Sequence, residues 1–402
     1  MTRSGAWAAA EHAARASRAR LVALLASNSG DLALAEDAVA AAFEQALVVW
    51  PERGVPANPD GWLLTVARNR QRDVWKSAAH RTAAPLEQVP DNVGSVATLD
   101  EVDPDAIPDR RLALLFVCAH PAIAESARTP LMLQAVLGFD AAQVASVFAV
   151  SSSAMAGRLV RAKRRIRDAR IPFVVPDRTV MPERLPAVLE AVYGCFTIAR
   201  GPGVTPMASE SLYLATVLAE SVDEPEAWGL ASLIALSLSR AGATGADFVP
   251  LDEQDPASWD AELAERGERM LRRASAGGRI GRFQLEAAMQ AVHAARRHTG
   301  VTDWPALDTL SRALVHTAPT LGSRVARAAI AGRVDGPEAG LDVLDAVARD
   351  HPAATSYQPF HAVRADLLAR AGRTADARAA FDRAAELATD DAVRAWLRNR
   401  SP

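Results

Sequence analysis

The most reactive side chains in this sequence are its cysteines and histidines. Cys118 and His120 lie two positions apart in VCAHPA, which resembles half of a metal site. A Cys-based zinc site needs a second pair of ligands, and the sequence has none. It also contains no glycine-rich phosphate loop, HExxH or nucleophile elbow. We therefore expect no enzymatic activity, no metal and no cofactor, and we interpret Cys118 and Cys195 as buried helical residues.

Basic side chains gather in two segments, and this pattern favours contacts with nucleic acid. In each segment, 62–81 and 158–170, many Lys and Arg residues accompany a single acidic residue. Because the whole chain has a net charge of −3, any nucleic-acid contact must come from such local patches. The first segment also places an aromatic residue on a basic helical stripe, which suits stacking on an unpaired base. The stripe consists of Arg68, Arg72, Trp75 and Lys76. Core packing is an equally good interpretation of Trp75.

Length and composition predict several helical domains. The chain has 402 residues, which corresponds to two or three domains. Half of the residues are hydrophobic but only 5% are aromatic, a mixture that favours an all-α fold over a β-sandwich or barrel. We find neither a signal-peptide pattern nor a run of about 18 uncharged apolar residues, so we expect a cytoplasmic protein that does not contact membranes.

Proline and charge divide the chain into four segments. Residues 82–109 lack Lys and Arg and combine acidic residues with prolines, which predicts a linker. This linker separates a helical unit at 1–81 from a second helical unit at 110–172. A longer helical region, 173–402, follows, and it resembles a tetratricopeptide repeat toward 324–400, where Ala377 and Phe381 fit the repeat's Ala-x3-Phe pattern.

The first unit is predicted to contain an amphipathic helix that begins after Asp31 and ends at Pro51. Asp31 is a suitable N-cap, and apolar residues follow at helical spacing. The apolar stripe consists of Leu32, Ala35, Val39, Ala42, Phe43, Ala46, Leu47 and Trp50. The opposite face carries the polar residues Glu36, Asp37, Glu44 and Gln45. The next helix should begin at Asn58-Pro59, with a stripe of Leu63, Val66, Arg70 and Val74 whose stems can pack.

The second unit has the pattern of a helix-turn-helix. A helix is predicted to open at Thr129-Pro130, and Asp140 with Gln143 forms a capping-box pattern that opens the next one. After a short turn at Val150-Ser151 comes SSSAMAGRLVRAKRRIRDAR, which has one apolar face and a basic C-terminal half. The apolar face consists of Met155, Leu159, Ala162 and Ile166.

Taken together, DLALAEDAVAAAFEQALVVW, NPDGWLLTVARNRQRDVWK and SVFAVSSSAMAGRLVRAKRRIR resemble the sigma-70 family of RNA polymerase sigma factors. The closer similarity is to the extracytoplasmic-function (ECF) group, in particular to a subgroup with a tetratricopeptide-like C-terminal extension. The resemblance implies binding to core RNA polymerase, through its β′ clamp helices and β flap, and to promoter DNA. It also leaves room for a regulatory protein on the extension.

The resemblance implies a role for individual residues. The polymerase-docking face would consist of Asp31, Glu36, Asp37, Glu44 and Gln45. Melting and reading the upstream edge of the transcription bubble would fall to Arg68, Asn69, Arg72, Asp73, Trp75 and Lys76. Contact with the minus-thirty-five element would fall to Ser152, Ser153, Ala156, Arg158, Arg161, Lys163 and Arg164. A second hypothesis is a DNA-binding regulator or scaffold that acts without polymerase. Only the sigma factor needs the polymerase-docking face, so this face distinguishes the two hypotheses.

Overall fold

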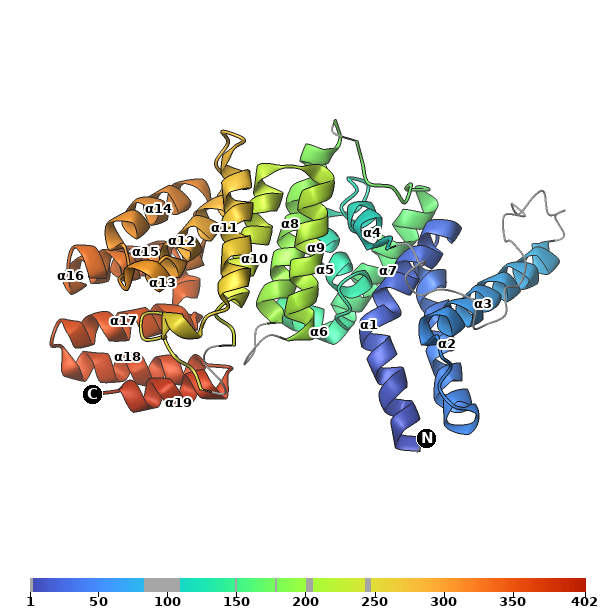
Figure 1. Cartoon of the computed structure of the whole chain (residues 1–402), viewed down its shortest axis with the longest axis horizontal. Coiled ribbons are helices and arrows are strands. Elements are labelled where there is room, and N and C mark those ends of the chain that lie inside the picture. The colour runs from blue at the N-terminus through green and yellow to red at the C-terminus, as the bar shows by residue number, and fades with distance from the viewer. Residues whose placement is uncertain (1–2, 83–108, 149, 178, 200–204, 243–246) are drawn as a thin grey trace. The chain divides into compact units, whose positions relative to one another are not determined.

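The computed structural model describes residues 3–82, 109–148, 150–177, 179–199, 205–242 and 247–402 (Figure 1). Throughout these ranges the chain forms helices joined by turns and loops, without any β-strand. The predicted all-α fold is confirmed. Most of the predicted linker lies outside the described residues. No helix within the described ranges is long and apolar enough to cross a membrane.

The chain forms two compact units, Met1–Cys195 and Phe196–Pro402, divided within the last turn of α8 (Met181–Ile198). The first unit thus contains both segments that were predicted to bind nucleic acid. The second unit contains the remainder of the extension.

The N-terminal part of the first unit packs α1 (Arg3–Ser29), α2 (Leu32–Arg53) and α3 (Pro59–Thr82) against one another. Trp50 is fully buried and meets Trp62 edge to face, with ring centroids 5.6 Å apart. The predicted caps are present: Asp31 accepts a hydrogen bond from the Leu34 amide, and Asn58 accepts one from the Gly61 amide. These caps fix the direction of the two helices that carry the predicted binding faces.

Three details of this part were predicted wrongly. Pro51 does not end α2, which continues to Arg53 before Gly54 caps it. Proline removes the helical hydrogen bond to the Leu47 carbonyl in the last turn of α2, and the helix ends two residues later. Leu47 lies outside the buried stripe and is 47% exposed. Arg70 is exposed on α3 and does not pack.

The C-terminal part of the first unit consists of α4 (Arg111–Cys118), α5 (Glu125–Ala135), α6 (Ala141–Val147), α7 (Ser152–Asp168) and α8. The predicted capping box of Asp140 and Gln143 opens α6. The predicted start at Thr129-Pro130 is wrong, because α5 begins at Glu125 and Pro130 lies inside it. Proline leaves the carbonyl four residues back, that of Ser126, without its helical donor, and Arg158 of α7 supplies a replacement at 3.2 Å.

The second unit is an array of helices in chain order. It comprises α9 (Pro206–Val222), α10 (Pro225–Leu238), α11 (Ala261–Ser275), α12 (Arg282–Ala294), α13 (Arg296–Thr299), α14 (Trp304–Thr317), α15 (Leu321–Val334), α16 (Pro337–Asp350), α17 (Gln358–Arg370), α18 (Thr374–Leu387) and α19 (Asp391–Arg400). Its last three helices lie side by side (Figure 1). The predicted Ala-x3-Phe positions, Ala377 and Phe381, are buried in α18, while the assignment to a tetratricopeptide repeat stays a prediction.

The loop between α10 and α11 ties distant helices of this unit together. Arg296 of α13 donates to the carbonyl oxygens of Leu251, Asp252 and Gln254. Arg333 of α15 pairs with Asp252 at 2.5 Å, and Arg400 of α19 pairs with Glu253 at 2.9 Å. This acidic loop therefore connects α13, α15 and α19, which are far apart in the sequence.

Candidate functional site

Helix α7 presents its predicted apolar side to the core. Its N-cap, Ser151, accepts a hydrogen bond from the Ala154 amide at 3.2 Å. The four predicted core residues, Met155, Leu159, Ala162 and Ile166, are buried. The first turn of the opposite face is exposed and consists of Ser152, Ser153 and Ala156. The predicted helix-turn-helix, α6 followed by α7, leaves the N-terminal end of its second helix accessible, which is the end that reads base edges in such motifs.

The predicted phosphate-binding cations of α7 fall into two groups. Arg161 and Arg164 are exposed and have no partner among the described residues. In contrast, Arg158 donates to the Ser126 carbonyl, and Lys163 forms an ion pair with Glu36 of α2. The free cations are therefore the ones best placed to neutralise phosphates without breaking an existing bond.

The predicted docking residues of α2 and its N-cap also form two groups, one exposed and one already paired with α7. Asp37, Glu44 and Gln45 are exposed, whereas Glu36 is committed to Lys163, and Asp31 lies 3.5 Å from the Arg167 guanidinium. The exposed face also includes Leu47 and Val48, which is 67% exposed. Sequence reasoning assigned Leu47 to the core and missed this apolar end. Its one signal was the run of four large apolar residues at 47–50, which is too long for a single buried stripe of a helix.

Helix α3 carries the predicted basic stripe on its outer side. Asn69, Arg72 and Lys76 are exposed, and Arg72 donates to the Asn69 side-chain oxygen at 3.1 Å. Arg68 and Trp75 are partly buried. Burial lowers the pKa of Arg68, and the positive charge of Arg72 lowers it further. An anion would relieve the repulsion between these arginines, so the stripe is suited to phosphate.

Cys118 and His120 differ in their burial and in their partners. Cys118 is fully buried, and burial raises the pKa of its thiol, with a further increase from the charge of Glu36. His120 uses Nδ1 to accept a hydrogen bond from the Ala122 amide at 3.1 Å. Across the described ranges, no cluster of three potential metal ligands occurs.

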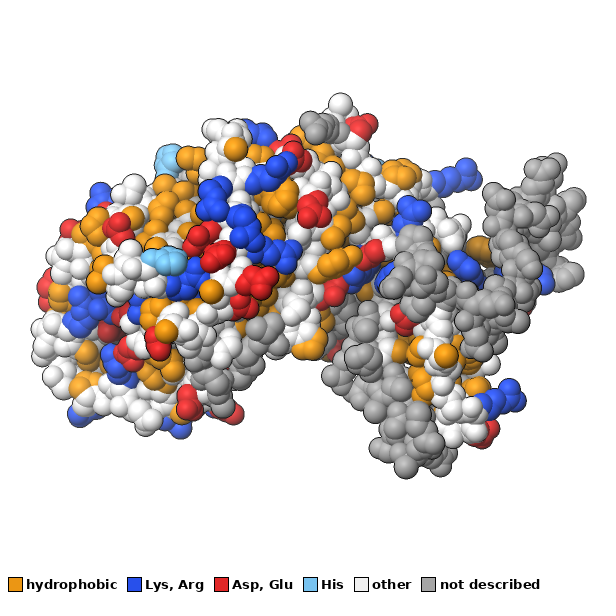
Figure 2. All heavy atoms as spheres, viewed as in Figure 1, with side chains coloured by type: hydrophobic (Ala, Val, Ile, Leu, Met, Phe, Trp, Pro, Cys, Tyr) orange, Lys and Arg blue, Asp and Glu red, His pale blue; other side chains and the backbone are white. Residues whose placement is uncertain are grey.

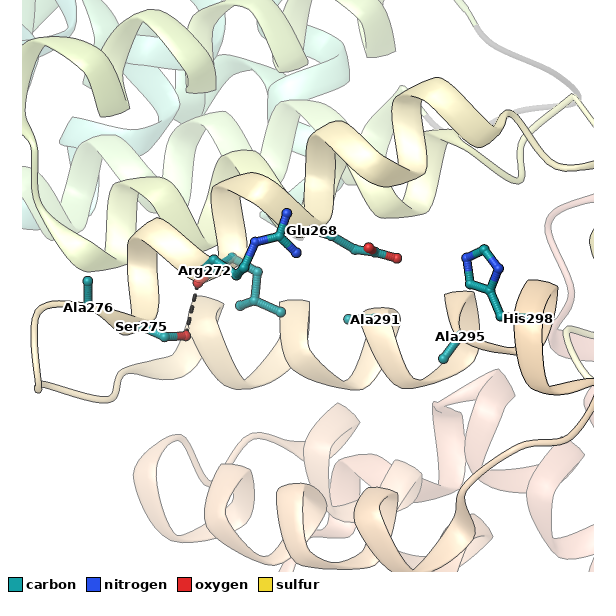
Figure 3. Close-up of a pocket in the computed structure, with 8 residues that line it drawn as sticks. Glu268, Arg272, Ser275, Ala276, Ala291, Ala295 and His298 are labelled. Atoms are coloured by element: carbon teal, nitrogen blue, oxygen red, sulfur yellow. Dashed lines mark hydrogen bonds between the residues drawn. The ribbon is translucent and has the colours of Figure 1, made fainter.

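The second unit offers an open cavity of about 680 Å³ between α11 and α12–α13 (Figure 3). Half of its lining residues are Ala or Leu, and Glu268, Arg272 and His298 are the charged or titratable groups. The Ser275 hydroxyl donates to the Leu271 carbonyl at 2.9 Å and is therefore not poised as a nucleophile. Figure 2 shows acidic and basic side chains interspersed on the visible face of this unit, which does not resemble a phosphate-binding patch.

Comparisons with known proteins place the chain in a family. It is 35% identical over 381 residues to the uncharacterized protein R00370 of Rhizobium meliloti (strain 1021), covering 92% of this chain and 89% of the relative. The chain belongs to the same family as this protein. Residues 184–275 match a family of unknown function, DUF6596.

A second similarity concerns a smaller part of the chain. The chain is 32% identical over 160 residues to the probable ECF RNA polymerase sigma factor SigI of Mycobacterium tuberculosis, in strains CDC 1551 / Oshkosh and ATCC 25618 / H37Rv. This match covers 39% of the present chain and 54% of SigI, so it spans about half the length of that relative. No solved structure gives a significant match.

Proposed function

We propose that this protein is an ECF-type sigma factor that binds core RNA polymerase and directs promoter-specific initiation of transcription. The observation that carries the proposal is the pairing, in one compact unit, of a helix-turn-helix with a separate helix whose exposed side is acidic and apolar. A DNA-binding regulator that acts without polymerase needs the helix-turn-helix but not the helix with the acidic and apolar exposed side. The partial similarity to SigI supports the same conclusion.

In this proposal, one surface binds polymerase and two others bind DNA. Asp37, Glu44 and Gln45 of α2 dock on the polymerase, where the adjacent Leu47 and Val48 add apolar contact area. The stripe on α3 binds backbone phosphates near the start of the open DNA, with Trp75 available for stacking. Arg161 and Arg164 of α7 bind phosphates of the upstream element, and the serine-rich first turn approaches the bases.

The second unit is proposed to regulate activity or assembly in cis. A helical array of this kind offers an extended surface for a peptide or a helix of another protein. Because both units share one chain, even a weak contact between them acts at an effective concentration of roughly millimolar. Truncation after Ile198 keeps α8 whole and tests this role: a change in promoter-dependent transcription by a soluble fragment supports it, and unchanged transcription contradicts it.

A DNA-binding regulator without polymerase remains the second candidate, because α7 already engages two of the five predicted docking residues, Asp31 and Glu36. Polymerase pull-down separates the two functions. The double variant Asp37→Lys/Glu44→Lys should lose core polymerase. The matched control Glu262→Lys/Glu265→Lys changes two exposed carboxylates of α11 by the same charge and should retain it. Equal recovery with both variants would remove α2 as the docking site.

A further inference from the structure

Glu36 and Lys163 belong to surfaces predicted to bind different partners, yet in the structure they bind each other. Helix α2 packs against α7, and Glu36 Oε2 forms an ion pair with Lys163 Nζ. The two side chains are only 12% and 10% exposed. A second, more exposed contact between Asp31 and Arg167 lies beside this pair, with 3.5 Å between the charged atoms.

The ion pair occupies both of its side chains. In this arrangement the Lys163 ammonium is unavailable to a DNA phosphate. Equally, the Glu36 carboxylate is unavailable to a partner protein. The paired and the partner-bound states therefore compete.

We propose that the Glu36–Lys163 contact is a latch between α2 and α7, which must separate before the protein binds polymerase or promoter DNA with full affinity. This inference rests on the proposed function, because it names the regulation of the same two surfaces. When only a fraction of the molecules is open, the apparent affinity for each partner is reduced by that fraction. Weakening the latch thus strengthens binding to both partners.

The chemistry of the pair makes the latch easy to open. The second carboxylate oxygen of Glu36, Oε1, is buried and accepts no hydrogen bond from the described residues. Separation of α2 from α7 returns this oxygen to water, which offsets part of the lost attraction. Removing the positive charge of Lys163 leaves the carboxylate buried without its partner and shifts the balance further toward the open state.

Each variant is tested with the partner whose proposed binding residue it leaves unchanged. Lys163→Met is assayed for binding to core polymerase, and Glu36→Gln for binding to a DNA duplex. Lys163→Arg, which keeps the charge, is the control. Spin labels at Val48→Cys and Val160→Cys report the separation of α2 and α7 in the full-length chain. These positions are 67% and 58% exposed, while both native cysteines are buried.

The latch predicts a longer label distance in both neutral variants and tighter partner binding, by roughly 5–10-fold if the closed state predominates at the start. The exchange Glu36→Lys/Lys163→Glu should restore the wild-type distance. Should Lys163→Met not fold, Lys163→Gln, which keeps a polar group beside Glu36, takes its place. An unchanged distance in every folded neutral variant overturns the latch. A lengthened distance without any polymerase binding supports the latch and contradicts the proposed function instead.

Discussion

Arg158 of α7 donates from Nη1 to the carbonyl oxygen of Ser126 in α5, at 3.2 Å. Ser126 stands four residues before Pro130, and proline cannot donate the hydrogen bond that this carbonyl would receive in a regular helix. The contact thus joins the two helices at a carbonyl of α5 that the proline leaves without its helical donor. It follows that Arg158 contributes to the folded structure as well as to the charge of α7.

We predict that Arg158→Met lowers the free energy of unfolding by about 1 kcal/mol, the value typical of one hydrogen bond. Chemical denaturation followed by circular dichroism measures this change. Arg161→Met removes the same charge from the same helix without removing an interaction among the described residues, and it should shift stability by less than about 0.5 kcal/mol. Equal unfolding midpoints for the two variants would show that the Ser126 contact contributes nothing.

DNA binding should depend on salt through the exposed arginines. Each phosphate neutralised changes the log–log slope of affinity against salt by about 0.9, so Arg161→Ala/Arg164→Ala should flatten the slope by nearly 2. Fluorescence anisotropy with one labelled duplex across a salt series measures this slope. The control Arg269→Ala/Arg272→Ala removes two exposed arginines from α11 and should leave the slope unchanged. A slope that both variants leave unaltered would exclude α7 as a DNA-binding helix.

The sequence was sufficient to predict the all-α fold, the capping residues and the buried side of α7, because these features depend on local hydrogen bonds and on helical periodicity. The ion pair between Glu36 and Lys163 was not predictable, since it joins positions 127 residues apart and depends on how α2 and α7 pack. Leu47 was misplaced for a similar reason: periodicity identifies an apolar residue but not whether a neighbouring helix covers it. The start of α5 was missed because proline favours a first helical turn but does not require one.

His293 should make the second unit sensitive to acid. Burial lowers its pKa from 6.5 to about 4, with further contributions from Arg240 and Arg296. Below about pH 6.5 the unfolded chain therefore binds a proton that the folded chain does not bind until the pH approaches 4. Stability should fall over this window by up to roughly 3 kcal/mol in total.

Urea unfolding between pH 7 and pH 4 measures the effect as a difference between wild type and His293→Phe. The ring of His293 lies edge to face with Trp304, with 6.5 Å between the ring centroids. Phenylalanine keeps a ring at this position, and the variant should lose less stability than wild type as the pH falls. His316→Gln, at an exposed position of α14, is the control and should follow the wild type. If wild type and His293→Phe lose the same stability between pH 7 and pH 4, His293 is not the source of the acid sensitivity.

Gly340 is predicted to permit the close approach of α15 and α16. A Cβ atom at this position would lie 2.7 Å from the Ala328 carbonyl oxygen, a backbone atom that cannot move aside cheaply. Gly340→Ala should therefore destabilise the second unit by about 1–3 kcal/mol, despite the better helix propensity of alanine. Gly322→Ala on α15 adds the same methyl group at 3.5 Å from the Tyr357 hydroxyl, an ordinary contact, and should not destabilise. Thermal unfolding compares the two, and equal midpoints would contradict the packing argument.

Transcription in vitro tests the central claim most directly. Core RNA polymerase is incubated with fragmented genomic DNA of the source organism, with and without the full-length protein, and the 5′ ends of the transcripts are sequenced. The account predicts transcripts with defined 5′ ends that require the protein and that disappear with Asp37→Lys/Glu44→Lys. If the protein binds DNA but produces no new defined 5′ ends, it is not a sigma factor and the account is wrong.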